Sequence, residues 1–268
     1  MGPLKKNLPK YLLWFVLILL IGALFGRRLF RLDGKKQPWP ATSGLVTAVY
    51  DGDTIKVKFA DGHSCKVRLI GVDAPELSAL NLSKRFKAFM SKRFAFSNLY
   101  RREVKLAFDR ELKDSYGRIL AYVWTEEVGL FNLYIIREGF ASALLYFPFR
   151  EDYRQQFQAA EKAARRDKKG IWHQIPYPRI KADQLAGYIG KIVTVVFNCH
   201  RLNRKRKLLF LAPSDRKLSA VIPLEYISAF PSIDNFLGKT LAVTGLLEQY
   251  KSQFQIFVFL PPQIKLEN

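Results

Sequence analysis

The sequence predicts a mainly β chain with helices: an N-terminal transmembrane helix, a β-barrel domain with helices, and a second small barrel. Three observations support this fold class. The first is an uncharged apolar run, YLLWFVLILLIGALFG, at residues 11–26. The second is a series of short segments in which apolar and charged residues alternate, as in half-buried strands. The third is a pair of proline-containing linkers, residues 37–42 and 175–181, which separate residues 1–36, 43–174 and 182–268.

Composition limits the partners and the cofactors. Lys and Arg number 44 against 23 Asp and Glu, a formal net charge of +21. An excess of this size favours a polyanion or an anionic membrane as partner, with simple solubility as the alternative. Two distant cysteines and three scattered histidines argue against a disulfide framework and against zinc. Carboxylates are the remaining metal ligands, and they suit a hard cation.

Residues 1–36 are expected to be a membrane anchor with basic flanks. The apolar run is about 24 Å long as a helix, slightly short of a hydrocarbon core of about 30 Å. An uncleaved single-pass anchor is favoured over a signal peptide, because no small-x-small cleavage site is evident and Arg27 and Arg28 follow directly. The side of the membrane stays open. The basic residues after the span favour the cytoplasm, whereas those before it resemble the start of an export signal.

In the first domain, alternation predicts strands at Thr54–Phe59 and Ser64–Ile70, joined by the turn signal Asp61-Gly62. These two strands should pair antiparallel, with Leu45–Tyr50 as a third candidate. Helical spacing and a cap at Ser83 predict a helix to Leu99. The later elements are strands at Val104–Phe108 and Ile119–Trp124, a short helix at Asn132–Glu138 closed by Gly139, and a polar helix at Arg150–Lys169 ended by Gly170.

Residues 182–268 change to short strands with one short helix, Leu224–Phe230, and no internal repeat is visible. This pattern predicts a small closed barrel of the OB type, with a β-sandwich as the alternative. The expected strands are Ile192–Phe197, Leu208–Ala212, Leu218–Ile222, Lys239–Leu247 and Gln253–Phe259.

Three short motifs carry the candidate chemistry: Asp51–Thr54 (DGDT), Arg68–Glu76 (RLIGVDAPE) and Asp114–Arg118 (DSYGR). Each motif alone predicts little more than a turn. Together, in this order and between these strands, they resemble the staphylococcal-nuclease-like, or thermonuclease, family over roughly residues 43–172, including LYIIREGF at 133–140. The resemblance implies a five-stranded OB barrel with three helices. It also implies hydrolysis of phosphodiester bonds in DNA and RNA, usually with calcium.

The acidic residues of these motifs fit that chemistry, which requires stabilised negative charge and an activated water. Two carboxylates, Asp53 and Asp73, suit a hard divalent cation that also binds a phosphate oxygen. By resemblance they are the Ca²⁺ ligands, together with the backbone carbonyl of Ala74. For Asp53 the alternative is a turn-capping role. By resemblance Glu76, behind Pro75, is the general base for the attacking water.

Arg68 and Arg118 match the family's two phosphate-binding arginines, and a planar guanidinium makes bidentate hydrogen bonds to phosphate. For Arg68 the alternative is an ordinary solvated strand residue. Tyr116 matches an aromatic beside the phosphate, with packing as an equal alternative, and Tyr146 loosely echoes an aromatic that contacts the nucleotide. The segment after Glu76 is short and lacks the family's glycine-rich acidic run, so the substrate rim should differ.

The second domain resembles OB-type nucleic-acid-binding modules appended to bacterial nucleases and helicases. A basic loop between its first two strands is expected to follow the phosphates of a single strand, with Phe197, Phe210 and Tyr250 as stacking platforms. A solvated hairpin with core aromatics is the alternative. The basic residues of the loop that we expect to bind substrate are Arg201, Arg204, Lys205 and Arg206.

These observations predict a membrane-anchored, calcium-dependent nuclease that acts on DNA, RNA or both with little sequence specificity. The alternatives are a non-catalytic nucleic-acid-binding tether built on a nuclease fold, and an adaptor that binds lipid headgroups. The enzyme is favoured because every acid and arginine of the set is present. No obligate protein partner is inferred, and endonucleolytic and exonucleolytic action are both compatible with the sequence.

Overall fold

The computed structural model describes residues 42–145, 150–173, 176–181, 184–230 and 232–267. The predicted membrane anchor lies outside these residues, as does Tyr146. No helix within the described ranges is long and apolar enough to cross a membrane. Residues 39–268 form one compact unit that contains both β-sheet domains.

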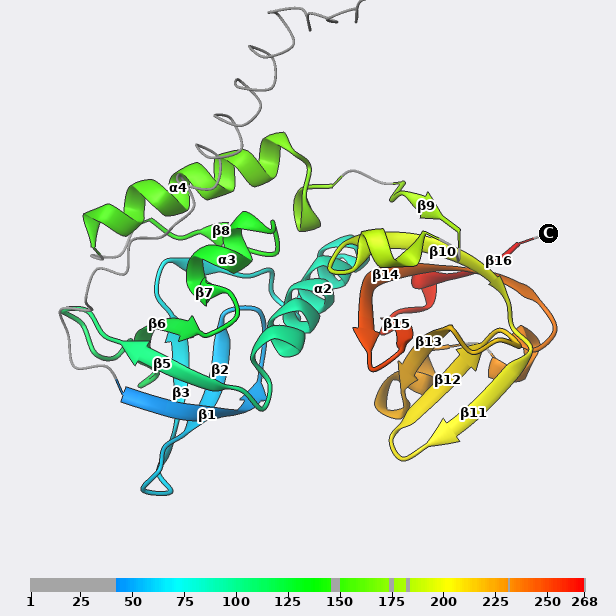
Figure 1. The fold of residues 1–268 in the computed structure, drawn as a ribbon, viewed down its shortest axis with the longest axis horizontal. Coiled ribbons are helices and arrows are strands. Elements are labelled where there is room, and N and C mark those ends of the chain that lie inside the picture. The colour runs from blue at the N-terminus through cyan, green and yellow to red at the C-terminus, as the bar shows by residue number, and fades with distance from the viewer. Residues whose placement is uncertain (1–41, 146–149, 174–175, 182–183, 231, 268) are drawn as a thin grey trace, which may run out of the picture. The chain divides into compact units, whose positions relative to one another are not determined.

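Five strands of the first domain form a closed barrel (Figure 1). Neighbouring strands pair antiparallel, and a parallel pairing of the third with the last closes the ring. The predicted hairpin is confirmed, because Ile55 lies opposite Val67 in an antiparallel register. The barrel strands are β1 Thr42–Val49, β2 Thr54–Lys58, β3 Ser64–Leu69, β5 Glu103–Ala107 and β6 Ile119–Thr125. The short strands β4 Val72–Asp73, β7 Gly129–Leu130 and β8 Ser142–Ala143 lie beside it, and β4 pairs with β8.

The first helix, α2, runs from Leu82 to Leu99, close to the prediction. Its cap is Asn81 and not Ser83, so that part of the prediction is wrong. The Asn81 Oδ1 atom accepts hydrogen bonds from the backbone N–H groups of Ser83 and Lys84, at 2.9 and 3.1 Å. Asparagine and serine both cap helices well, and the position of the first turn decides between them.

Two further helices, α3 Phe131–Arg137 and α4 Glu151–Arg166, follow the barrel strands, and both were predicted. Gly139 and Gly170 come after these helices with φ of +77° and +52°. A Cβ on Gly139 would lie 2.5 Å from the Lys169 carbonyl oxygen. The close crossing of the two chain segments therefore requires glycine.

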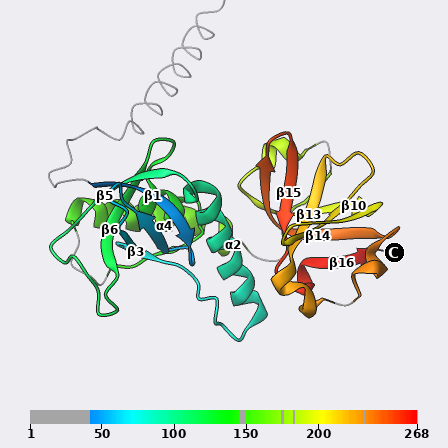
Figure 2. The same ribbon diagram turned by 90° about the horizontal axis from the view of Figure 1, so that it is seen from below.

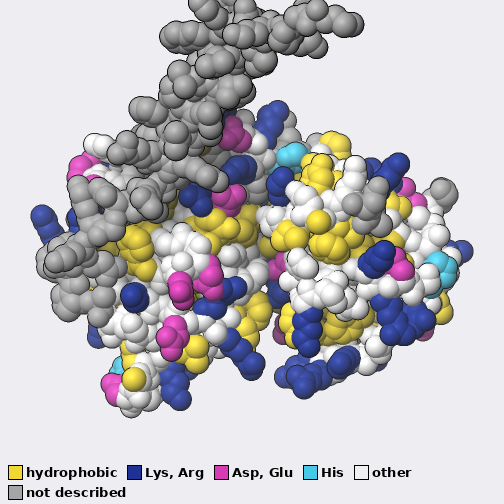
Figure 3. Space-filling view, in the orientation of Figure 1, with side chains coloured by type: hydrophobic (Ala, Val, Ile, Leu, Met, Phe, Trp, Pro, Cys, Tyr) yellow, Lys and Arg dark blue, Asp and Glu magenta, His cyan; other side chains and the backbone are white. Residues whose placement is uncertain are grey.

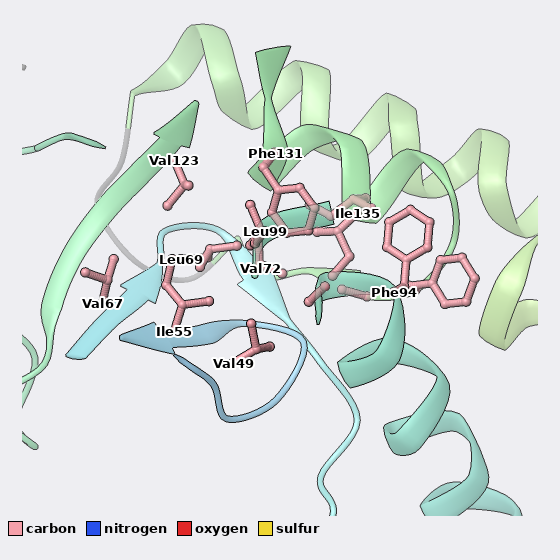
Figure 4. Close-up of a cluster of buried hydrophobic side chains, with 14 of the residues drawn as sticks. Val49, Ile55, Val67, Leu69, Val72, Phe94, Leu99, Val123, Phe131 and Ile135 are labelled. Atoms are coloured by element: carbon pink, nitrogen blue, oxygen red, sulfur yellow. The ribbon is translucent and has the colours of Figure 1, made fainter. Parts of the chain in front are cut away.

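The core of the first domain lies between the barrel and its helices. Figure 4 shows Val67 and Leu69 of β3, Phe94 and Leu99 of α2, and Phe131 of α3 in one cluster. These side chains are at most 4% exposed. The inward faces of the alternating strands thus became the core, as the sequence pattern indicates.

The second domain contains all five predicted strands and additional ones (Figures 1 and 2). The strands in the predicted positions are β10 Ile192–Asn198, β12 Leu208–Ala212, β13 Leu218–Pro223, β14 Thr240–Tyr250 and β15 Gln253–Phe257. The unpredicted strands are β9 Arg179–Ile180, β11 Arg201–Lys205 and β16 Ile264–Glu267. The predicted short helix is a 3-10 helix at Leu224–Ala229. The second domain has further 3-10 helices at Leu185–Tyr188, Ile233–Phe236 and Pro261–Gln263, and the first domain has one at Gly170–Trp172.

The basic segment predicted as a loop is mostly strand β11, so that prediction is wrong for Arg201, Arg204 and Lys205. The strand pairs antiparallel with β12 over its whole length. Its charged residues hide the strand signal, because an edge strand with one solvated face tolerates them. Arg206, in the turn to β12, has a φ of +54°.

The order of strand pairing in the second domain matches that of the first barrel. The sheet runs β11-β12-β13-β15-β14-β10, with β13 and β15 parallel. Strands β10 and β11 are separated only by Cys199 and His200, and together they correspond to β1 of the first barrel. With β12, β13, β14 and β15 corresponding to β2, β3, β5 and β6, the pairing order is the same in both domains. The two domains thus share a topology, although the sequence shows no repeat.

Helix α2 contacts β14 of the second domain. The Arg93 guanidinium pairs with the Glu248 carboxylate at 2.8 Å, and Ser97 donates a hydrogen bond of 2.6 Å to the same carboxylate. The backbone N–H of Leu246 lies 3.2 Å from the Met90 sulfur. Burial raises the pKa of Glu248, and the nearby Arg93 charge opposes that shift. Buried charges of this kind are retained only where they are paired.

Candidate active site

The turn between β1 and β2 brings Asp53 to the end of the barrel. Asp51 shapes this turn, because its Oδ1 atom accepts a hydrogen bond of 3.0 Å from the Asp53 backbone N–H. Asp53 itself is only 6% exposed. Its Oδ1 accepts the Thr54 hydroxyl at 2.9 Å, and its Oδ2 accepts the Ala74 backbone N–H at 2.8 Å. The DGDT motif therefore places a carboxylate inside the protein and against the Asp73-Ala74 segment.

Burial raises the pKa of Asp53 to about 7. The positive charge of Arg68 and the hydrogen bond from Ala74 oppose this shift, while the nearby carboxylate of Asp51 adds to it. One arginine therefore does not fully compensate the buried negative charge. A carboxylate in this condition is stabilised by an additional cation.

Arg68 on β3 holds the following turn in place. Its Nη1 atom donates to the carbonyl oxygens of Val72 at 2.6 Å and Leu69 at 3.2 Å, and its Nη2 atom lies 3.3 Å from Asp53 Oδ2. The side chain is 13% exposed. It is thus no ordinary solvated strand residue, and it fixes the segment that carries Asp73 and Glu76.

Asp73 and Glu76 differ from Asp53 in exposure. Both are solvent-exposed, and neither carboxylate has a hydrogen bond or ion pair with another described residue. Asp73 precedes Ala74, whose N–H binds Asp53, so the chain itself keeps the two aspartates near each other. Glu76 follows two residues later, after Pro75. These two carboxylates can therefore accept external groups.

The donor chemistry of this site fits a hard cation. Within the described residues no group of three or more His, Cys, Asp or Glu is arranged to hold a metal. The site instead supplies two aspartates and the Ala74 carbonyl, an all-oxygen set. Calcium accepts carboxylate, carbonyl and water oxygens in flexible combinations. Asp53, Asp73 and Ala74 are thus suited to a calcium ion completed by water.

Arg118 reaches the site through Thr54. Its Nη1 atom donates to the Thr54 hydroxyl oxygen at 3.4 Å, and that hydroxyl in turn donates to Asp53. Its Nε atom donates to Asp114 Oδ2 at 2.6 Å. Burial alone would raise the pKa of Asp114, but the hydrogen bonds and charge of Arg118 outweigh burial and lower it. The DSYGR turn thus orients its own arginine toward the barrel end.

Tyr116 lies at the tip of the same turn and is 84% exposed. Its ring centroid is 5.3 Å from the Arg118 guanidinium carbon. Packing, the alternative considered for this residue, is therefore not its role in this structure. The ring remains accessible to a ligand next to Arg118.

Three of the residues that shape the site had no predicted role. Thr54 and Asp51 stand in the DGDT motif, so their hydroxyl and carboxylate groups could have suggested a role in the site. Nothing in the sequence suggests a role for Ser91, because it occupies an ordinary helix position. A Cβ on Gly52 would lie 2.0 Å from the Ser91 Oγ atom and 2.8 Å from the Ala74 Cβ. The turn that carries Asp53 thus packs directly on α2.

The predicted basic residues of the second domain lie apart from this site. Arg201, Arg204 and Lys205 belong to β11, and no contact joins them to Asp53 or Arg68 among the described residues. Their predicted role in binding nucleic acid is therefore independent of the geometry around Asp53.

Comparison with known proteins identifies the family of the first domain. Residues 66–174 match the family described as staphylococcal nuclease homologue. The matched range includes Arg68, Asp73, Glu76 and Arg118, whereas Asp53 precedes it.

The chain is 40% identical over 132 residues to a thermonuclease of Staphylococcus intermedius, a match that covers 49% of this chain and 77% of the relative. It is 39% identical over 127 residues to a thermonuclease of Staphylococcus hyicus, covering 47% and 73%. It is also 34% identical over 157 residues to endonuclease YhcR of Bacillus subtilis, covering 52% of this chain but 12% of that larger protein. These matches confirm the prediction of an enzyme of this class. The chain belongs to the staphylococcal nuclease family of phosphodiester-cleaving enzymes.

Proposed function

We propose that this chain is a membrane-anchored, calcium-dependent nuclease that hydrolyses DNA, RNA or both with little sequence specificity. The observation that carries the proposal is the convergence at one barrel end of buried Asp53, Arg68, the Ala74 N–H and, through Thr54, Arg118. This arrangement combines a cation site with two guanidinium groups, the set that a phosphodiester requires.

Each residue of the site has a separate role in this proposal. Asp53, Asp73 and the Ala74 carbonyl would hold calcium, which when bound would supply positive charge for a phosphate oxygen. Arg118 and Arg68 bind and orient the phosphate through charge-assisted hydrogen bonds. Glu76, exposed and without another partner in the described part of the chain, accepts the proton of the attacking water. Tyr116 contacts the nucleotide beside Arg118.

Low sequence specificity follows from the kind of contacts involved. Arginines and a cation recognise phosphate, which is the same at every nucleotide, and sequence is read only through base edges. The sugar is also not read by these groups, so the site chemistry accommodates DNA and RNA alike.

The second domain is proposed to be an OB-type module that helps to hold nucleic acid. Its pairing order, shared with the first barrel, supports the OB assignment. Lys and Arg side chains gather over the β11–β12 hairpin (Figure 3), in the part of the chain that includes Arg201, Arg204, Lys205 and Arg206. A group of cations along one hairpin suits the phosphates of a single strand.

Membrane anchoring is proposed from the uncharged run at residues 11–26 and its basic flanks. Protease added to intact cells distinguishes the orientations. Digestion of residues 43–268 would place the nuclease on the outer face, and protection until lysis would place it in the cytoplasm. Recovery of the full-length protein in the soluble fraction would contradict anchoring.

The decisive test is a cleavage assay on the full-length chain, purified in mild detergent. Calcium should support degradation of DNA or RNA, and a chelator should stop it reversibly. Glu76→Gln and Arg118→Ala should each lower kcat by at least about 100-fold. The exposed-residue controls Glu126→Gln and Arg110→Ala should retain wild-type rates. Binding of intact nucleic acid in calcium, without cleavage, would instead support a non-catalytic tether.

A further inference from the structure

A cavity of about 470 Å³ lies between α2 and the second domain. Its walls include Lys92 of α2 on one side and Lys207 and Leu208 on the other. Cavities of this size are within the usual range for ligand sites. The charges on its walls favour an anion, because Lys92 and Lys207 have no ion pair among the described residues and Glu225 is the single unpaired carboxylate in the lining.

The sheet face beside this cavity carries basic and aromatic side chains. Along β12, Leu209 and Leu211 point into the core, so Leu208 and Phe210 point outward. Phe210 lies opposite Asn203, and Leu208 lies opposite Lys205. The outward face of the β11–β12 hairpin therefore combines Lys205 and Phe210 and continues into the cavity at Leu208.

Phe210 is the aromatic on this face that is available for stacking. It is half-buried, and it has no ring contact or cation-π contact with another described residue. The neighbouring rings are already covered: the Arg93 guanidinium lies 3.6 Å from the Phe257 centroid and 4.8 Å from the Phe96 centroid. A half-buried phenylalanine outside both hydrophobic cores is partly accessible to a base.

The cavity adjoins the catalytic turn. Val49, the last residue of β1, lines the cavity and is followed directly by the turn that carries Asp53. On α2, Ser91 packs against Gly52 of that turn, and the next residue, Lys92, lines the cavity. The buried Arg93–Glu248 pair holds α2 against the second domain. A strand bound at the active site therefore has a basic cavity beside it.

We propose that this cavity and the outward face of β11–β12 form one composite site for single-stranded nucleic acid, built by both domains. Lys92, Lys207 and Lys205 bind its phosphates, and Phe210 stacks on a base. A single strand is required, because a lone phenylalanine face reaches a base only when that base is unstacked from its neighbours. This inference rests on the proposed nuclease function and extends it by joining α2 of the first domain and the β11–β12 hairpin of the second in one binding site.

The test is binding of a fluorescent oligothymidine, single-stranded or annealed to its complement, to the full-length protein in chelator, followed by anisotropy. Lys92→Glu and Lys207→Glu should each weaken single-strand binding by about tenfold and reduce its salt dependence. Phe210→Ala should weaken it by about five- to 100-fold. The exposed lysine control Lys58→Glu, on β2, should bind like the wild type. Melting temperatures check that each variant is folded, and Lys207→Gln provides a milder change at the same position.

A second readout separates this inference from the proposed function. A dinucleotide bound at the active site has no flanking nucleotides to occupy the composite site, so its calcium-dependent cleavage should be unchanged in Lys207→Glu and Phe210→Ala. If the wild type cleaves but these variants bind oligothymidine normally, the composite site is refuted while the nuclease stands. If nothing is cleaved but the variants still lose binding, the nuclease assignment fails and the site stands. Preference for duplex, or binding of polyglutamate in place of oligothymidine, would also overturn the composite site.

Discussion

Replacing Asp53 with asparagine should stabilise the protein in the absence of metal at alkaline pH. Asp53 is 6% exposed, and burial raises its pKa to about 7. Asparagine has nearly the same shape. Its carbonyl oxygen can accept the Ala74 N–H, and its amide can donate to the Thr54 hydroxyl, which is free to rotate. The substitution therefore removes a buried charge and retains the hydrogen bonds.

The magnitude follows from the two pKa values. A pKa of about 7 in the folded protein against an ordinary value of 3.8 corresponds to at most about 4 kcal/mol. Because the folded pKa is the higher one, the protonated form contributes stability that is complete below pH 3.8. This contribution is lost as pH rises through about 7. At pH 8 in chelator, Asp53→Asn should unfold with a free energy higher than that of the wild type by up to about 4 kcal/mol.

Urea denaturation from pH 4 to pH 8, in chelator, measures this difference. The wild type should lose stability relative to Asp53→Asn as pH rises, and the exposed turn variant Asp61→Asn should follow the wild type. Calcium should narrow the difference at pH 8, since it adds about 2.7 kcal/mol to the wild type at 100 times its Kd and little to the variant. Parallel curves for wild type and Asp53→Asn in chelator would refute the reasoning.

Three further perturbations test other parts of the fold. Glu248→Ala leaves the Arg93 charge buried and should lower the free energy of unfolding by about 3–5 kcal/mol in urea denaturation; a loss below about 1 kcal/mol would contradict a buried pair. Gly52→Ala places a Cβ 2.0 Å from Ser91 Oγ, so kcat should fall while the far-UV circular dichroism stays native, and an unaltered kcat would argue against the close packing. Phe157→Ala empties a fully buried position and should cost about 3–5 kcal/mol by calorimetry, whereas an unchanged Tm would show that Phe157 is not core.

The local sequence pattern was sufficient to predict the strands and helices that have one buried and one exposed face. The β2–β3 hairpin follows from alternation around Asp61-Gly62, because a strand with one buried face must alternate. Helix α2 follows from its apolar spacing, although the choice of Asn81 over Ser83 as cap does not. Strand β11 was missed because its residues are mostly charged, and only pairing with β12 makes it a strand.

The motifs predicted which residue types belong to the site, but their roles as ligands, base and phosphate binders remain predictions for the variants above to test. Asp51 and Thr54 were visible in the DGDT motif without a role. Their hydrogen bonds to Asp53 show why the motif needs those residues and not only the second aspartate. The contact of Ser91 with Gly52 could not be predicted, because nothing in a helical sequence pattern marks the residue that another segment will contact.

The sequence by itself determined the local units: which strands alternate, where the turns fall, and which turns carry carboxylates and arginines. Only the tertiary structure decided that Asp53 meets the Ala74 N–H 21 residues away, that Arg118 reaches Thr54 across 64 residues, and that Arg93 pairs with Glu248 across 155. The physical reason is closure of the barrel. The parallel pairing of β3 with β6 is a long-range contact that no local propensity encodes, and it brings the Arg68 and Arg118 ends of those strands to the same place.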